Sequence, residues 1–159
     1  QLVVLGTGEA RYHEFFTKLA ADFPQKVGIE LSFNDPLAHQ IEAGCDLFLM
    51  PSRYEPCGLN QMYSLRYGTV PVVRRTGGLA DSITNTSPAS IKSGNATGFV
   101  FTPYEGRYLL ATIERALNLY KTDKTVWKQV VKRGMNEDFS WARSAKAYER
   151  LMKKMLAQP

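Results

Sequence analysis

Short runs of apolar and β-branched residues alternate along this chain with longer segments of helical character. The runs cover residues 2–5, 27–33, 46–50, 70–73 and 99–101. Between them lie segments that begin at turn residues and repeat apolar side chains at helical spacing. This alternation is typical of a parallel sheet with helices on both faces, so we predict an α/β fold.

The expected helices lie between these runs and after the last of them. We predict helices over residues 10–22, from 35, over 58–67 and from 79, followed by a polar loop over 84–97. Three further helices are expected to close the chain. Two of them carry apolar stripes that we expect to pack in the core: Leu109, Ile113, Leu117 and Tyr120 in the first, and Trp141, Ala145, Tyr148, Met152 and Met155 in the last.

The length of 159 residues suits a single domain. We expect this domain to span residues 1–159, with the last helices, about 105–159, packing on it. No apolar run approaches the ~20 residues that a membrane span requires, so we expect no membrane partner.

The charge of the chain favours anionic partners in general, with a net value of +5 and a pI of about 9.3. The basic residues are scattered over predicted helix faces and form no RNA-binding or zinc-finger signature, so we expect no nucleic acid partner. The cysteines (Cys45, Cys57) and histidines (His13, His39) lack metal-binding spacing, and we expect neither a metal nor a cofactor. The reduced cytoplasm is the expected compartment.

The stretch from Asp46 to Asp81 carries the candidate chemistry. An apolar run ends at Pro51, a polar turn then presents Glu55, and Pro56 is expected to open a helix. A second run over 70–73 leads through two arginines into a glycine pair and another helix. Ligands of open parallel sheets bind at the carboxyl ends of strands, where turns lead into helix N-termini. A carboxylate, cations, glycines and backbone N–H groups at two such ends suit an anionic sugar-phosphate ligand.

The residues EPCGLNQMYSLRYGTVPVVRRTGGLAD, at positions 55–81, resemble the signature of bacterial glycogen synthases and plant starch synthases. A Glu-Pro-x-Gly turn alone indicates only the wider GT-B group. Cys57, the Gln61-Met62-Tyr63 run and the run over 74–78 narrow the resemblance to enzymes that use ADP-glucose. It extends upstream through IELSFNDPLAHQIEAGCDLFLMPSRYEPCGL and downstream through ATGFVFTPYEGRYLLATIERAL to NEDFSWARSAKAYERL, so it covers most of the chain.

This resemblance implies a Rossmann-like parallel sheet that forms the C-terminal, nucleotide-sugar-binding half of a GT-B glycosyltransferase. The implied activity is glycogen (starch) synthesis, in which glucose passes from ADP-glucose to the non-reducing end of an α-1,4-glucan with retention. ADP-glucose and ADP are the implied ligands of this half. The alternatives are a GT-B transferase for another nucleotide sugar and a non-catalytic nucleotide-binding module.

Glu55 lies where the family places a catalytic-site glutamate. A carboxylate there can bind hydroxyls of the transferred glucose and stabilise positive charge at its anomeric carbon. The structural alternative is a carboxylate at a helix N-terminus, where the helix dipole favours negative charge and the stabilisation is about 0.3–1 kcal/mol. Many GT-B relatives carry a second glutamate eight positions later, where this chain has Tyr63. A covalent glycosyl-enzyme from this motif is therefore not expected, and front-face transfer is the preferred mechanism.

The remaining candidates are expected to bind the donor nucleotide. Cys57, Gly58, Leu59 and Asn60 are expected to form the first helical turn, whose free N–H groups can hold a diphosphate, although a plain helix start explains them equally. Phe33 either stacks on adenine or packs in the core. The other candidates on the cleft are Tyr63, Thr76, Gly77 and Gly78, whereas solvation of the strand end accounts for Arg74 and Arg75.

Two further features limit this interpretation. Gly6 and Gly8 follow the first strand as in a dinucleotide-binding turn, but Arg11 stands where the third glycine belongs, so we predict a tight turn and no nicotinamide site.

The chain begins without methionine inside a strand-like run. The family's diphosphate-binding arginine and lysine, and its N-terminal acceptor domain for the α-1,4-glucan, are absent from these residues. We therefore expect a fragment that is inactive by itself.

Overall fold

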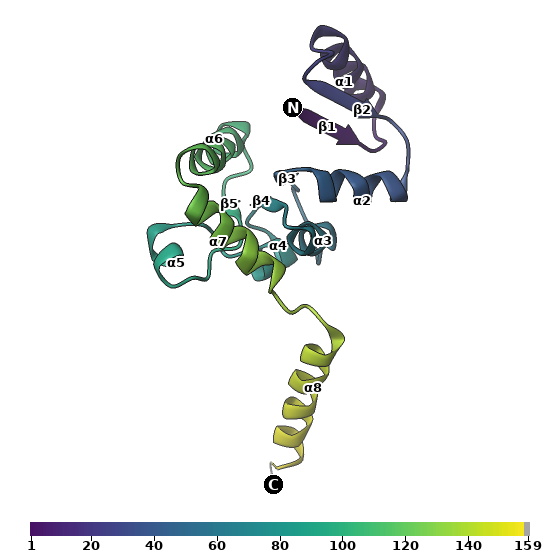
Figure 1. Cartoon of the computed structure of the whole chain (residues 1–159). Coiled ribbons are helices and arrows are strands. Elements are labelled where there is room, and N and C mark those ends of the chain that lie inside the picture. Colours follow the sequence, from purple (N-terminus) through teal and green to yellow (C-terminus); the bar gives the residue numbers. More distant parts are fainter. Residues whose placement is uncertain (158–159) are drawn as a thin grey trace. The chain divides into compact units, whose positions relative to one another are not determined.

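The computed structural model describes residues 1–157 and divides the chain into two compact units, Gln1–Cys45 and Asp46–Pro159. Figure 1 labels their strands and helices in chain order. The expectation of one domain over residues 1–159, with the last helices packed on it, stays a prediction. No helix within residues 1–157 is long and apolar enough to cross a membrane.

The first unit contains two strand–helix pairs. They are β1 (Leu2–Leu5), α1 (Ala10–Asp22), β2 (Val27–Glu30) and α2 (Asp35–Gly44). The two strands are parallel, with Leu2 opposite Val27 and Leu5 opposite Glu30. The strand β2 ends three residues before the predicted end at position 33, since the chain turns toward the cap of α2. There the Asn34 side chain accepts a hydrogen bond from the backbone N–H of Leu37 at 3.0 Å.

The second unit contains a three-stranded parallel sheet in the order β3-β4-β5. Its strands are β3 (Leu47–Met50), β4 (Val70–Arg74) and β5 (Phe99–Phe101). Its helices are α3 (Asn60–Tyr67), α4 (Gly77–Ser82), α5 (Pro88–Lys92), α6 (Gly106–Thr122), α7 (Lys124–Met135) and α8 (Trp141–Leu156). All the paired strands of both units are parallel, and helices separate them, as the sequence predicts.

The core of the second unit covers both faces of this sheet, because successive side chains of a strand point to opposite faces. Val70 and Val72 of β4 pack with Phe99, Ala116 and a group from α7, Trp127 and Val130. On the other face, Val73 and Val100 pack with Leu65, Leu79 and Ile83, which come from α3 and α4 or follow α4. The predicted α/β fold with helices on both faces is confirmed.

The two predicted apolar stripes differ in the structure. In α6, Leu109, Ile113 and Tyr120 pack against the core, although Leu117 remains 39% exposed. In α8 no residue is buried, and Trp141 is 86% exposed. The prediction that the α8 stripe packs in the core is therefore wrong in this structure, because an amphipathic pattern shows which face is apolar and not what covers it.

The polar segment expected to be a loop contains one more helix. The helix α5 (Pro88–Lys92) interrupts it and begins with a capping box. The side chain of Ser87 accepts from the backbone N–H of Ser90, and the side chain of Ser90 accepts from the backbone N–H of Ser87. The prediction missed this helix because the box uses a second serine where a glutamate or glutamine is usual.

Candidate functional site

The turns that follow β3 and β4 lie side by side at the carboxyl edge of the sheet. The two strands are parallel neighbours, with Met50 opposite Val73, so both chains leave the sheet at the same edge. The backbone N–H of Gly78 donates to the carbonyl oxygen of Glu55 at 3.1 Å. The two strand ends that the sequence indicated as the candidate site therefore lie together, with a direct hydrogen bond between their turns.

The glycine pair after β4 allows this close approach. A Cβ atom on Gly77 would collide with the carbonyl oxygen of Glu55, and one on Gly78 would collide with the carbonyl oxygen of Cys57. Gly77 also has a positive φ of 41°. Backbone atoms cannot move aside as a flexible side chain can, so only glycine fits at these two positions.

The buried side chain of a glutamine holds the turn after β3 in place. Gln61 is fully buried, and its Nε2 donates to the carbonyl oxygens of Cys57 and Gly58, both at 3.1 Å. The same nitrogen lies 3.2 Å from the Oγ of Ser82, which donates to the carbonyl oxygen of Gly78 at 2.6 Å. Gln61 is a site-forming residue that the sequence reasoning used only as part of the family signature. Its position three residues after a turn glycine is the signal that was available.

The helix after this turn begins later than predicted. The helix α3 starts at Asn60, with Leu59 as its N-cap, and Gly58 has a left-handed φ of 71°. Gly58 is therefore a turn residue and not a helical one, because a positive φ is incompatible with a right-handed helix, and Cys57 before it also lies outside α3. The prediction of a helical turn over Cys57, Gly58, Leu59 and Asn60 is wrong at its start.

The backbone N–H groups of this turn are nevertheless available. Within residues 1–157, those of Cys57, Gly58, Leu59 and Asn60 donate no hydrogen bond to a carbonyl or a side chain. Cys57, Leu59 and Asn60 are exposed to solvent, and Cys57 is a free thiol. Neighbouring free amides at the entry of a helix form a binding place for an anion.

Glu55 places a carboxylate beside these amides. Its side chain is half-buried, and its Oε2 accepts a hydrogen bond from the Oγ of Ser52 at 3.3 Å. The carbonyl oxygens of Ser52 and Arg53 accept from the Nη1 of Arg74, at 3.4 Å and 2.6 Å. An oriented carboxylate next to an anion-binding turn can act on a substrate that carries both a phosphate and a reacting centre of positive character.

The comparisons with known proteins agree with this geometry. The family model of glycosyl transferases group 1 matches residues 1–133 of the chain. The chain belongs to the group 1 glycosyl transferases.

Its relatives within this family include bacterial glycogen synthases. Glycogen synthase 1 of Methylococcus capsulatus is 50% identical over 157 residues, which cover 99% of this chain and 32% of that protein. The glycogen synthase of Geobacillus stearothermophilus is 52% identical over 158 residues, covering 97% of this chain and 32% of that protein. The chain thus spans about a third of the length of the curated relatives it matches.

A solved structure supports the same fold. The catalytic domain of starch synthase IV from Arabidopsis thaliana, bound to ADP and acarbose, superposes with a TM-score of 0.84 at 35% identity. The match covers 99% of this chain and 33% of that one. The predicted resemblance to the glycogen and starch synthases is therefore confirmed.

The other predicted site residues of this glycosyl transferase occupy several places. Thr76 is the half-buried N-cap of α4. Tyr63 and Leu59, 40% and 51% exposed, border a groove of about 490 Å³ between α3 and the segment after α7. Phe33 lies in the first unit, directly before the cap of α2, and is 90% exposed, so the alternative of core packing is wrong. Binding roles for all of them stay predictions.

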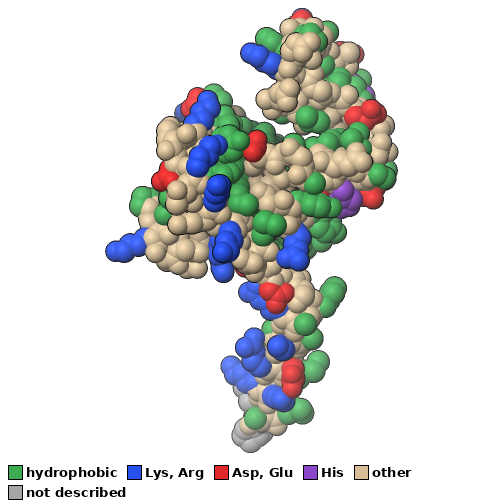
Figure 2. All heavy atoms as spheres, viewed as in Figure 1, with side chains coloured by type: hydrophobic (Ala, Val, Ile, Leu, Met, Phe, Trp, Pro, Cys, Tyr) green, Lys and Arg blue, Asp and Glu red, His purple; other side chains and the backbone are tan. Residues whose placement is uncertain are grey.

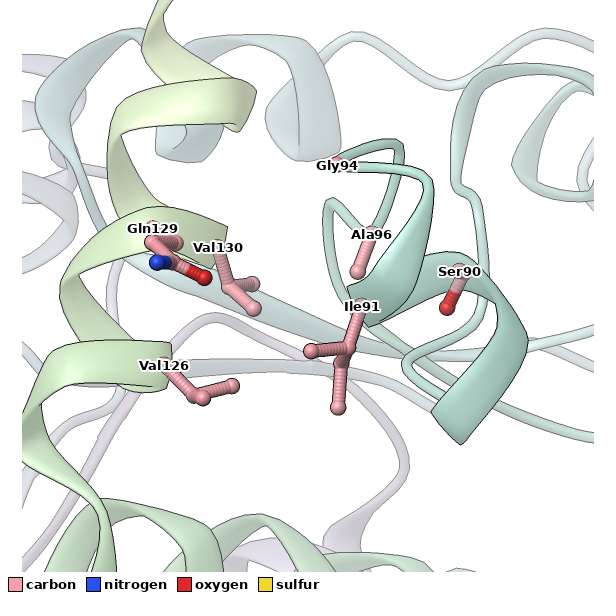
Figure 3. Close-up of a pocket in the computed structure, with 7 residues that line it drawn as sticks. All are labelled: Ser90, Ile91, Gly94, Ala96, Val126, Gln129 and Val130. Carbon is pink, nitrogen blue, oxygen red and sulfur yellow. The ribbon is translucent and has the colours of Figure 1, made fainter.

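Two other surface features carry no comparable chemistry. A cavity of about 20 Å³ lies between α5 and α7, where the side chains of Ile91, Val126 and Val130 line it (Figure 3). It has room for about one water molecule and not for a nucleotide. Figure 2 shows Lys and Arg side chains spread over the visible face among uncharged ones, in the scattered pattern that the sequence indicated.

Proposed function

We propose that this chain is the donor-binding part of a glycogen synthase. That enzyme would transfer glucose from ADP-glucose to the non-reducing end of an α-1,4-glucan, with retention. The observation that carries the proposal is the row of open amides at residues 57–60 beside the Glu55 carboxylate. It occurs in a chain about half identical to curated glycogen synthases.

In this proposal the turn after β3 holds the diphosphate. Gly58 takes the left-handed conformation that leads from the free N–H of Cys57 to those of Leu59 and Asn60, and a Cβ at this position would collide with the side chain of Gln61. Amides that bond to no other group give up no internal hydrogen bond when they bind phosphate oxygens. The structural relative from Arabidopsis thaliana bound to ADP supports a nucleoside diphosphate as the ligand class.

Glu55 would act on the sugar. Its carboxylate is proposed to bind glucose hydroxyls and to stabilise the positive charge that develops at the anomeric carbon as the diphosphate leaves. Tyr63, one of the residues on the exposed side of α3, offers no second carboxylate. Attack of the glucan hydroxyl from the side that the diphosphate vacates is then the preferred route to retention.

The further predicted roles belong to the same proposal. Thr76, Gly77 and Gly78 would line the donor cleft, and Phe33 would stack on the adenine base. The glucan acceptor would bind to an N-terminal domain outside these residues, and the cytoplasm is the proposed compartment. A GT-B transferase for another nucleotide sugar is the first alternative, and a non-catalytic nucleotide-binding module is the second.

The test uses a chimera in which this chain replaces the matching 158 residues of the Geobacillus stearothermophilus glycogen synthase. We expect it to elongate glucan from ADP-glucose. Calorimetric titration should give tighter binding of ADP-glucose than of UDP-glucose, and no binding of NAD. Preference for UDP-glucose would favour the first alternative, and nucleotide binding without transfer would favour the second.

The 159-residue chain alone is expected to bind ADP more weakly than the chimera does and to transfer no measurable glucose. The reason is that the chain spans only about a third of the length of the glycogen synthases it matches. Robust glucan elongation by this chain alone would contradict the proposal that it binds only the donor and that another domain binds the glucan.

A further inference from the structure

The guanidinium group of Arg74 joins the ends of three neighbouring strands. Arg74 is the last residue of β4, and its Nη1 donates to the carbonyl oxygens of Arg53 at 2.6 Å and Ser52 at 3.4 Å, in the turn after β3. Its guanidinium carbon lies 5.3 Å from the ring centroid of Tyr104, in the turn after β5. Hydrogen bonds from a charged donor and a cation–π contact therefore hold this side chain in one place.

The neighbouring arginine has no such contacts. The side chain of Arg75 is exposed, and within the described part of the chain it makes no hydrogen bond or ion pair. Only its backbone N–H is used, in a 2.8 Å bond to the carbonyl oxygen of Phe101. The sequence interpretation, in which both arginines solvate the strand end, thus fits Arg75 and is wrong for Arg74.

The arginine at position 74 also carries a cost to stability. Its Nε is buried, and within residues 1–157 it has no hydrogen-bond partner. A buried donor without a partner costs stability, so such groups concentrate where a function keeps them. What Arg74 does hold is the pair of peptide groups from which the Ser52 hydroxyl reaches the Glu55 carboxylate at 3.3 Å.

We propose that Arg74 is a positioning residue for Glu55. It fixes the carbonyl groups of Ser52 and Arg53 against the end of β4, and the fixed turn sets the direction of the Ser52 hydroxyl and of the carboxylate that accepts from it. The inference deepens the proposed function, on which its catalytic consequence rests. The mechanical part, that Arg74 fixes this turn, stands on the contacts alone.

The mechanical part is tested in the 159-residue chain by amide hydrogen exchange. The reporter is the backbone N–H of Gly78, which bonds to the carbonyl oxygen of Glu55 at the far end of the same turn. In Arg74→Met its exchange should become faster by about tenfold, since loss of a charged donor frees the turn to open. Arg75→Met is the matched control and should leave this exchange within about twofold of the original value.

The catalytic part is tested in the chimera. Arg74→Met should lower kcat by about 10- to 100-fold while the KM for ADP-glucose and the Kd for ADP change by less than about threefold. Arg74→Lys keeps the charge but not the planar, forked guanidinium group, so its kcat should lie between those of the unsubstituted chimera and Arg74→Met. In a Glu55→Ala background, Arg74→Met should lower kcat no further, because the carboxylate through which it acts is gone.

Each outcome of these experiments either supports or contradicts the positioning role of Arg74. Equal loss of kcat in both backgrounds would mean that Arg74 contacts substrate directly, and unchanged exchange at Gly78 would mean that it does not fix the turn. Either result overturns the proposal, as does an Arg75→Met variant that behaves like Arg74→Met. If the unsubstituted chimera transfers no glucose, the proposed function fails, and the exchange experiment still decides whether Arg74 positions the turn.

Discussion

The turn after β3 and the turn after β4 contain the same kinds of residue and use them differently. Gly58 in the first has a left-handed φ of 71°, and the amides around it are open. Gly77 and Gly78 in the second have the carbonyl oxygens of Glu55 and Cys57 where a Cβ would lie. The first glycine leaves room for the buried side chain of Gln61, and the second pair leaves room for the first turn.

This difference indicates that the two turns have different roles, one in support and one in ligand binding. The second turn is a support, because its glycines and the Gly78 N–H hold the first turn in place. We propose that the first turn is the surface that meets the ligand, because the backbone N–H groups of residues 57–60 donate no hydrogen bond within the described part of the chain. Substitutions in the first turn should therefore change binding or turnover, and those in the second should change stability first.

The largest effect is expected for Glu55→Ala in the chimera. Loss of one preorganised electrostatic group should lower kcat on the order of 10²-fold or more. The KM for ADP-glucose should change much less, since phosphates and adenine dominate ground-state binding. Steady-state kinetics with ADP-glucose measures both constants. A lowered melting temperature with near-normal turnover of the folded enzyme would assign Glu55 a structural role.

The second turn is tested by Gly78→Ala in the 159-residue chain. The added Cβ must displace backbone, so the free energy of unfolding should fall by about 1–3 kcal/mol or more. Gly106→Ala is the control, because a Cβ there meets nothing within 4 Å. Urea unfolding compares the two variants. If Gly78→Ala weakened ADP binding without loss of stability, ligand binding and not support of the first turn would be the main role of Gly78, and the division between the turns would be wrong.

Gly58→Val tests the first turn in the opposite sense. A branched side chain at this positive φ is strained and would displace the Gln61 side chain that holds the turn, so ADP and ADP-glucose should both bind about tenfold more weakly. Gly94→Val is matched, because Gly94 has a similar φ of 69° but lies in the α5 region. Both variants should lose stability, Gly58→Val more because its Cβ also meets Gln61 whereas a Cβ at Gly94 meets nothing within 4 Å, and only Gly58→Val should lose affinity. Intact ADP binding in Gly58→Val would remove the phosphate-binding role.

The smallest effect is expected for Cys57→Ser. The proposed contact is the backbone N–H of residue 57, which survives the change, so ADP affinity and kcat should stay within about twofold. Titration with ADP and a rate assay of the chimera test this together. Abolished turnover would require Cys57 to be reconsidered as a chemical participant, because its thiol is free and exposed.

Much of the fold was predictable because it depends on local pattern. Runs such as 70–73 have no polar residue and match buried strands, and the segments between them match helices, so the parallel α/β order follows from residue spacing alone. Coverage of a helix by its surroundings is not a local property. Hence the stripe of α6 packs in the core as predicted except at Leu117, whereas that of α8 remains exposed.

The sequence by itself determined the strand-end location of the candidate site and its polar residues. It placed Glu55, Gly58 and the glycine pair at neighbouring turns, because parallel strands deliver their carboxyl ends to one edge of the sheet. The tertiary structure alone decided which backbone groups are paired. It decided that α3 starts at Asn60. It also decided which carbonyl groups accept hydrogen bonds from Gln61 and from Arg74. Residue spacing carries no information on such bonds, because they depend on how closely two turns approach.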